Sequence, residues 1–102
     1  MLVIGENINA SNRSVAQAIV NRDRGFLGTL ARTQAAAGAD FIDVNAGIGQ
    51  ASREQEIAAM EWLVEVVQEA TSRPLVIDSD SPGVIEAALR KCHSERLIIN
   101  SV

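Results

Sequence analysis

The chain has 102 residues, of which 47% are hydrophobic and 22% are charged, and its formal net charge at pH 7 is −4. This composition favours a folded soluble protein over a disordered one and fits one small domain. The acidic balance argues against general nucleic-acid binding, which requires a basic face. Cys92 is the single cysteine, which excludes an internal disulfide. Because no apolar run is long enough for a signal peptide or a membrane span, we expect a cytoplasmic protein that binds no membrane.

Four short apolar runs alternate along the chain with segments of helical periodicity. The runs occupy residues 2–4, 41–44, 75–77 and 97–99. They are continuous and rich in Val and Ile, as is typical of strands that are buried on both faces of a parallel sheet. Helix-start signals follow the first three runs, and strands that alternate with helices indicate βαβ units.

The helix signals are local and specific. Asp23 is predicted to cap a helix that runs to about Ala37, with Gly38 at the position of a left-handed C-cap, after a shorter helical segment at 14–20. Ser52 and Gln55 have the spacing of a capping box, and Ser81 precedes Pro82 as an N-cap precedes proline at the first helical position.

The predicted fold class is α/β, with four parallel strands that alternate with helices. No helix covers the fourth strand, so we expect the N-terminal half of a (βα)8 TIM barrel or a small open sheet completed by a partner. The barrel requires the sequential strand order 1-2-3-4, whereas a flavodoxin-like sheet would place the first strand between the second and third.

Polar residues are predicted where each strand ends, on the edge that carries ligand sites in parallel α/β folds. Asn9 follows the first strand, Asp43 and Asn45 the second, Asp78 the third and Asn100 the fourth. Carboxylates accept hydrogen bonds and an Asn amide can both donate and accept, which suits a flat heterocycle. Asn9 could instead serve only to shape a turn.

The sequence predicts no metal site and identifies no catalytic residue. His93 is the single histidine, and its position beside Cys92 does not have the spacing of a zinc site. A dinucleotide fingerprint is also excluded, because Gly47 and Gly49 lack a third glycine at the required spacing.

Five segments, in order along the chain, resemble the pterin-binding barrel of methyltetrahydrofolate:corrinoid methyltransferases, of which dihydropteroate synthase is a more distant relative. The segments are residues 4–9, 38–45, 59–66, 74–79 and 99–101. The resemblance implies that residues 1–102 belong to a pterin-binding domain in which Asp78 and Asn100 hydrogen-bond the pterin ring. It also implies transfer of the N5-methyl group of methyltetrahydrofolate to the cobalt of a corrinoid (cobalamin) held by a partner protein.

A complete barrel needs roughly 200–250 residues, so we expect this chain to carry part of the site and to be inactive alone. The alternatives are a non-catalytic module that acts through oligomerisation, or a dihydropteroate synthase-like pterin enzyme. Among relatives of this kind the methyl donor is a folate, tetrahydromethanopterin or a quaternary amine such as glycine betaine. We also expect a homo-oligomer, because open strand edges and an apolar inner face call for a partner. That face is predicted to contain Val3, Ile42, Val76 and Ile98.

Overall fold

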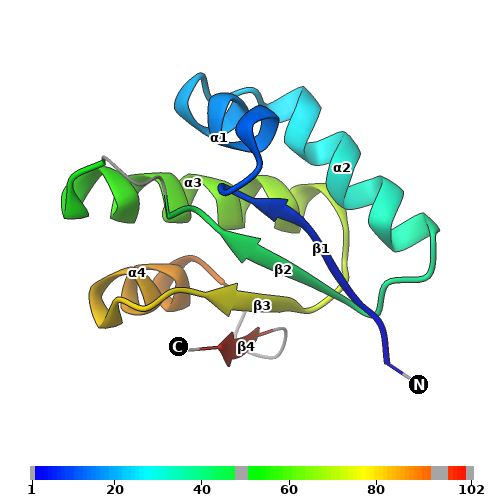
Figure 1. Ribbon diagram of the computed structural model, residues 1–102. Coiled ribbons are helices and arrows are strands. Elements are labelled where there is room, and N and C mark those ends of the chain that lie inside the picture. Colours follow the sequence, from blue (N-terminus) through cyan, green and yellow to red (C-terminus); the bar gives the residue numbers. More distant parts are fainter. Residues whose placement is uncertain (1, 48–50, 93–96, 101–102) are drawn as a thin grey trace.

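The computed structural model describes residues 2–47, 51–92 and 97–100. Its strands form one sheet in the order β1-β2-β3-β4, and every neighbouring pair is parallel (Figure 1). Their bounds are β1 (Ile4–Asn9), β2 (Phe41–Asn45), β3 (Leu75–Asp78) and β4 (Leu97–Asn100). The sequential order confirms the predicted N-terminal part of a TIM barrel and excludes the flavodoxin-like order.

The helices begin where the cap signals place them. Their bounds are α1 (Arg13–Val20), α2 (Arg24–Ala36), α3 (Arg53–Ala70) and α4 (Pro82–Lys91). Asp23 and Ser81 accept hydrogen bonds from the first turns of α2 and α4, and Ser52 and Gln55 form the complete capping box of α3. Gly38 has a φ of 102°, the left-handed conformation expected after α2. None of these helices is long and apolar enough to cross a membrane.

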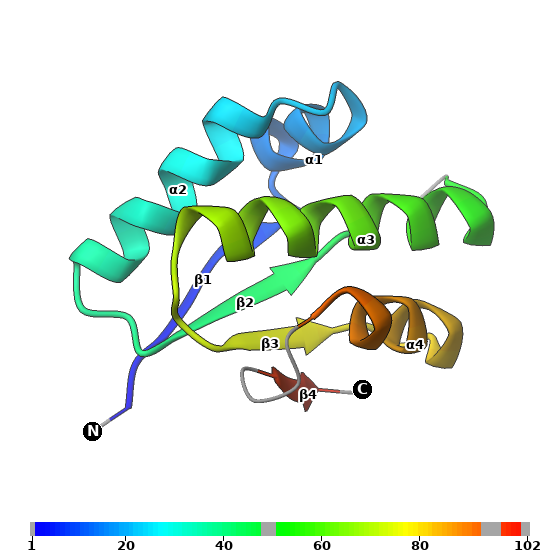
Figure 2. The same ribbon diagram turned by 180° about the vertical axis from the view of Figure 1, so that it is seen from behind.

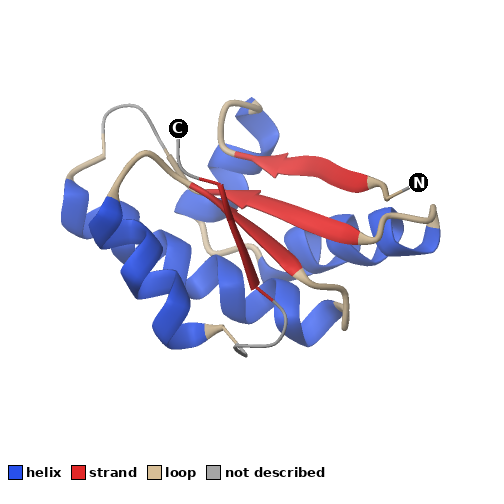
Figure 3. Cartoon of the chain, turned by 90° about the horizontal axis from the view of Figure 1, so that it is seen from below, coloured by secondary structure: helices blue, strands red, loops and turns tan. Residues whose placement is uncertain are grey.

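The helices cover one face of the sheet and leave the other face open. Figure 2 shows α3 in front of β1 and β2, and α4 in front of β3, whereas Figure 1 shows the strands in front. Residues of β2 and β3 that face the helices are fully buried: Ile42, Val44, Leu75 and Ile77. Phe41, Asp43 and Asn45 alternate with them and therefore project to the open face. The strands fan out with the expected twist (Figure 3).

The predicted position of the first strand is wrong. The strand was expected at residues 2–4, but it begins at Ile4 and ends at Asn9, while Leu2 and Val3 have exposed fractions of 71% and 47%. The apolar character of residues 2–4 misled the prediction, because pairing with β2 decides where the strand lies.

The predicted composition of the inner face also needs correction. Ile42 lies on the helix-covered face with none of its surface exposed, because the alternation of β2 directs it there. Val76 shares the open face with Asp78 and is 5% exposed. The side chain of Ile98 lies outside the described part of the molecule.

A β-bulge interrupts β1 at the level of Asp43. Gly5 pairs with Ile42 and Ile8 with Val44, so Glu6 and Asn7 together oppose the single residue Asp43. The extra residue changes the face of everything that follows it. It directs Ile8 into the core beneath the helices, where none of its surface is exposed, and brings Asn9 opposite Asn45.

Candidate functional site

The carboxyl ends of the four strands bring the predicted residues together along one edge of the sheet. Asn9 pairs with Asn45 across β1 and β2, and Asp78 pairs with Asn100 across β3 and β4. Asp43 lies one pleat before Asn45 on the open face. The prediction that Asp78 and Asn100 occupy adjacent strand ends is therefore confirmed for the backbone. The side chain of Asn100 lies outside the described residues.

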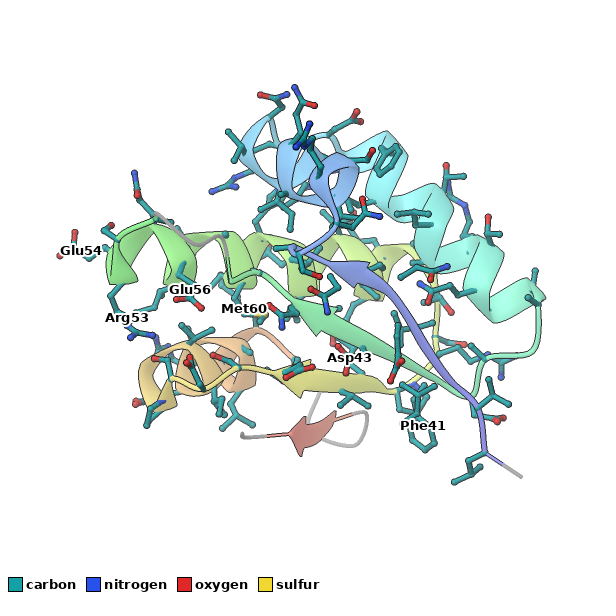
Figure 4. The ribbon with its side chains drawn as sticks, viewed as in Figure 1. Phe41, Asp43, Arg53, Glu54, Glu56 and Met60 are labelled. Atoms are coloured by element: carbon teal, nitrogen blue, oxygen red, sulfur yellow. The ribbon has the colours of Figure 1, made fainter. Side chains whose placement is uncertain are left out.

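Asp43 is a buried carboxyl group in an acidic environment. Only 6% of its surface is exposed, and Figure 4 labels it on β2 beside β3. The pKa of Asp43 is raised from its ordinary 3.8 to about 7, first by burial and then by the negative charges of Asp78 and Glu6 and a hydrogen bond with Asp78. Asp43 therefore keeps its proton to a higher pH than an ordinary aspartate does.

The side chains of Asn9 and Asn45, which pair across β1 and β2, have the same orientation relative to their own backbones. The Oδ1 atom of Asn9 accepts from the N–H of Ser11 at 2.9 Å, and the Oδ1 atom of Asn45 accepts from the N–H of Gly47 at 2.9 Å. Each side chain closes a turn over its own backbone. The turn reading of Asn9 is therefore confirmed, and both amides present their NH2 groups as donors.

Two hollows lie at these strand ends. One of about 320 Å³ is lined by Asn45, Gly47, Glu56, Asp78, Ser79 and Asp80. The other, of about 410 Å³, lies beside β1 and is lined by residues that include Glu6, Asn7, Asn9 and Ser11. Among the described residues, no Lys or Arg lines either hollow. Both therefore favour neutral ligands that offer N–H and C=O groups over phosphorylated ones.

Two acidic residues at this edge, Glu6 and Glu56, are not among the predicted site residues. Glu6 opposes Asp43 across the bulge, and Glu56 reaches the strand ends from the first turn of α3 (Figure 4). The Glu56 side chain is 18% exposed and its Oε1 atom lies 3.4 Å from Nη1 of Arg53. Glu6 could have been found from its place in β1, but the sequence carries no signal for Glu56, since its location depends on how α3 packs.

The described carboxylates are not arranged as a metal centre: within residues 2–47, 51–92 and 97–100, no group of three or more His, Cys, Asp and Glu side chains could hold a metal ion.

A separate hollow of about 310 Å³ lies between the end of α1 and the start of α3, where the guanidinium of Arg22 stands 5.3 Å from the ring centre of Trp62. Of the residues that line the strand-end hollow, it shares only Glu56.

Comparison of the sequence with known proteins agrees with the fold. A family model described as "Pterin binding enzyme" matches residues 5–102. A methylcorrinoid:tetrahydrofolate methyltransferase of Eubacterium limosum is 39% identical over 102 residues, which is all of this chain and 36% of that protein. The chain thus spans about a third of the length of this curated relative. Parallel βα units with polar residues at the strand ends, together with the match to almost the whole chain, establish that it belongs to the pterin binding enzyme family.

Proposed function

We propose that residues 1–102 form a pterin-binding domain and contribute part of the reduced-folate site of a methyltransferase. The enzyme moves a methyl group between N5 of tetrahydrofolate and the cobalt of a corrinoid that a partner protein carries. The observation that carries this proposal is the carboxyl pair Asp43–Asp78 beside the donor amides of Asn9 and Asn45, at the ligand-binding edge of a parallel sheet. The name of the Eubacterium limosum relative supports the substrate class.

The polar groups match the edge of a reduced pterin. The ring offers N–H groups and an exocyclic amine next to a carbonyl oxygen, so it needs acceptors and donors in the same pocket. The Asp78 carboxylate is the acceptor for ring N–H groups, and the Asn45 amide, which lines the same hollow, is a donor for the carbonyl. Asn9, which lines the neighbouring hollow beside β1, is assigned to the edge of the ligand that extends toward β1. Asn100, in register with Asp78, is assigned to the neighbouring ring edge.

Methyl transfer also requires a proton. In the direction from folate to corrinoid, the N5–C bond breaks and the cobalt's electron pair forms the new bond to carbon, while N5 keeps the bonding pair and takes up a proton. A group with a pKa near 7 is suited to exchange that proton at neutral pH. Asp43 is the described group with this property, and we assign to it the storage of this proton rather than direct contact with N5.

The proposal is tested with the full-length natural protein, methyltetrahydrofolate and cob(I)alamin, by following methylcobalamin in the visible spectrum. We expect turnover in one or both directions, and a loss of at least about tenfold in kcat/KM for Asp78→Asn, which removes a charged acceptor. Methyl-tetrahydromethanopterin and glycine betaine serve as alternative donors. Turnover with glycine betaine but with no pterin would contradict the assignment.

A further inference from the structure

We propose that Gln34 of α2 is a positioning residue: its side chain holds the β1 bulge, and the bulge directs Ile8 into the core and sets Asn9 against Asn45. Its relevance to ligand binding rests on the proposed function, but the arrangement itself can be tested without a ligand. No feature of the sequence near β1 identifies Gln34, which lies 27 positions beyond Asn7.

The first step is the contact between Gln34 and the bulge. The Oε1 atom of Gln34 accepts a hydrogen bond from the backbone N–H of Asn7 at 3.0 Å. Asn7 is one of the two residues that oppose Asp43, and a bulge leaves its extra residue without a partner in the ladder. Gln34 is 6% exposed, so this hydrogen bond satisfies the bulge from within the layer between α2 and the sheet.

The second step is the space that the glutamine occupies. A Cβ atom on Gly5 would lie 2.3 Å from Oε1 and 2.9 Å from Cδ of Gln34, which no real contact permits. Gly5 is therefore the residue that lets the glutamine reach Asn7, and any side chain there would displace it. Gly5 leaves the space and Gln34 supplies the hydrogen bond, and the bulge begins directly after Gly5.

The third step is the consequence for the site. Without the extra residue, Ile8 would pair with Asn45 on the open face and Asn7 would face the helices, because a one-residue slip moves every side chain to the other face. With the bulge, Ile8 is buried in the core and Asn9 pairs with Asn45. The bulge thus decides which residue of β1 stands beside Asn45 at the carboxyl edge of the sheet.

The Nε2 atom of Gln34 supports a role other than simple packing. It is buried and has no hydrogen-bond partner among the described residues. An unsatisfied buried amide costs free energy that a leucine or methionine of similar size would not. The hydrogen bond that Gln34 Oε1 accepts from the Asn7 N–H therefore explains why a glutamine occupies this position.

The experiment uses the full chain with ¹³C-methyl-labelled isoleucine, and the Ile8 signal is assigned with Ile8→Val. A soluble paramagnetic probe broadens methyl signals that reach water, so Ile8, which is fully buried, is protected in the unsubstituted protein. We expect Gln34→Leu to reduce the protection of Ile8 while Ile42 and Ile77, which are buried on β2 and β3, stay protected. Gln17→Leu, on the exposed side of α1, is the matched control and leaves all three signals unchanged.

Unchanged protection of Ile8 in folded Gln34→Leu, or an equal loss of protection at Ile8, Ile42 and Ile77, would overturn the proposal. Gly5→Ala gives an independent route to the same displacement and should reproduce the Gln34→Leu result. Should neither variant fold, hydrogen exchange of the unsubstituted protein decides: slow exchange of the Asn7 amide supports the contact, and exchange as fast as in an exposed loop contradicts it. Methyltetrahydrofolate is absent from all these measurements, so failure of the proposed function would not alter them.

Discussion

The buried carboxyl of Asp43 makes stability depend on pH in a defined direction. Its pKa is about 7 in the folded state and near the ordinary 3.8 when unfolded, so the folded protein holds a proton that the unfolded chain releases. The free energy of unfolding therefore falls as the pH rises from about 4 to about 7, by up to about 1.4 kcal/mol per pH unit from this group. Above that window the contribution is constant.

Asp43→Asn removes this dependence. In urea denaturation we expect the variant to gain stability relative to the unsubstituted protein, and the gain to be larger at pH 8 than at pH 5. Asp40→Asn is the control, because Asp40 accepts from the Val3 N–H at the opposite end of the sheet. An equal difference at both pH values would show that Asp43 ionises normally.

The orientation of Asn45 is tested by a substitution that preserves the turn. Asn45→Asp keeps an oxygen for the Gly47 N–H, but it replaces the donor NH2 with a further carboxylate near Asp43 and Asp78. We expect the affinity for methyltetrahydrofolate to fall by at least about tenfold in calorimetry, since a donor is lost and like charges are brought together. Asn21→Asp, at the end of α1, makes the same chemical change away from the site and should leave the affinity unaltered.

Among the elements, α3 begins at a capping box that two neighbouring residues form. Ser52 Oγ accepts from the Gln55 N–H at 3.2 Å, and Gln55 Oε1 accepts from the Ser52 N–H at 2.9 Å. Ser52→Ala removes the first of these hydrogen bonds, and we expect a loss of about 1 kcal/mol in the free energy of unfolding. Ser72→Ala, in the exposed turn after α3, is the control. Equal losses in the two variants would refute the role of the cap.

The parts of the fold that the sequence predicts depend on neighbouring residues. Ser52 and Gln55, which are three positions apart, predict the start of α3. Continuous apolar runs predict β2 and β3 without reference to any other part of the chain. The bulge of β1 is different, because it depends on a glutamine 27 positions away and on pairing with β2. Because neither dependence is visible in the local sequence, the apolar run at residues 2–4 predicts a strand that lies too early in the chain.

The candidate site divides in the same way. Asp43, Asn45, Asp78 and Asn100 were predicted because parallel strands place their carboxyl ends on one edge. The donor orientation of Asn9 and Asn45 could not be predicted, since it depends on turns that the chain makes after each strand. Glu56 was missed because a residue in the first turn of a long helix reaches the site only through tertiary packing.

At the scale of the whole molecule, the open sheet leaves apolar surface exposed. Leu2, Val3 and Ile4 have exposed fractions of 71%, 47% and 46% along β1 and the segment before it. Exposed strands of this kind pair with other chains. In light scattering, we expect the 102-residue chain to self-associate at micromolar concentration, as the predicted homo-oligomer requires. A folded species at the monomer mass of 10.9 kDa would contradict this.

The surface responsible is tested by introducing a charge. Ile4→Lys places a cation on the open strand and should shift the distribution toward smaller species, because lysine on an edge strand opposes pairing. Val20→Lys is the control, since Val20 is 63% exposed but belongs to α1 and not to the sheet. Equal effects of both substitutions would place the association surface elsewhere.

The central claim, a pterin site at the carboxyl ends of the strands, is tested most directly by calorimetric titration of methyltetrahydrofolate into the full-length natural protein and its Asp78→Asn variant. The loss of one hydrogen bond to a charged group costs about 1.5–3 kcal/mol. We therefore predict a dissociation constant about tenfold to a hundredfold larger for the variant, and no change for Asp40→Asn. Equal affinity of Asp78→Asn and the unsubstituted protein would contradict the account.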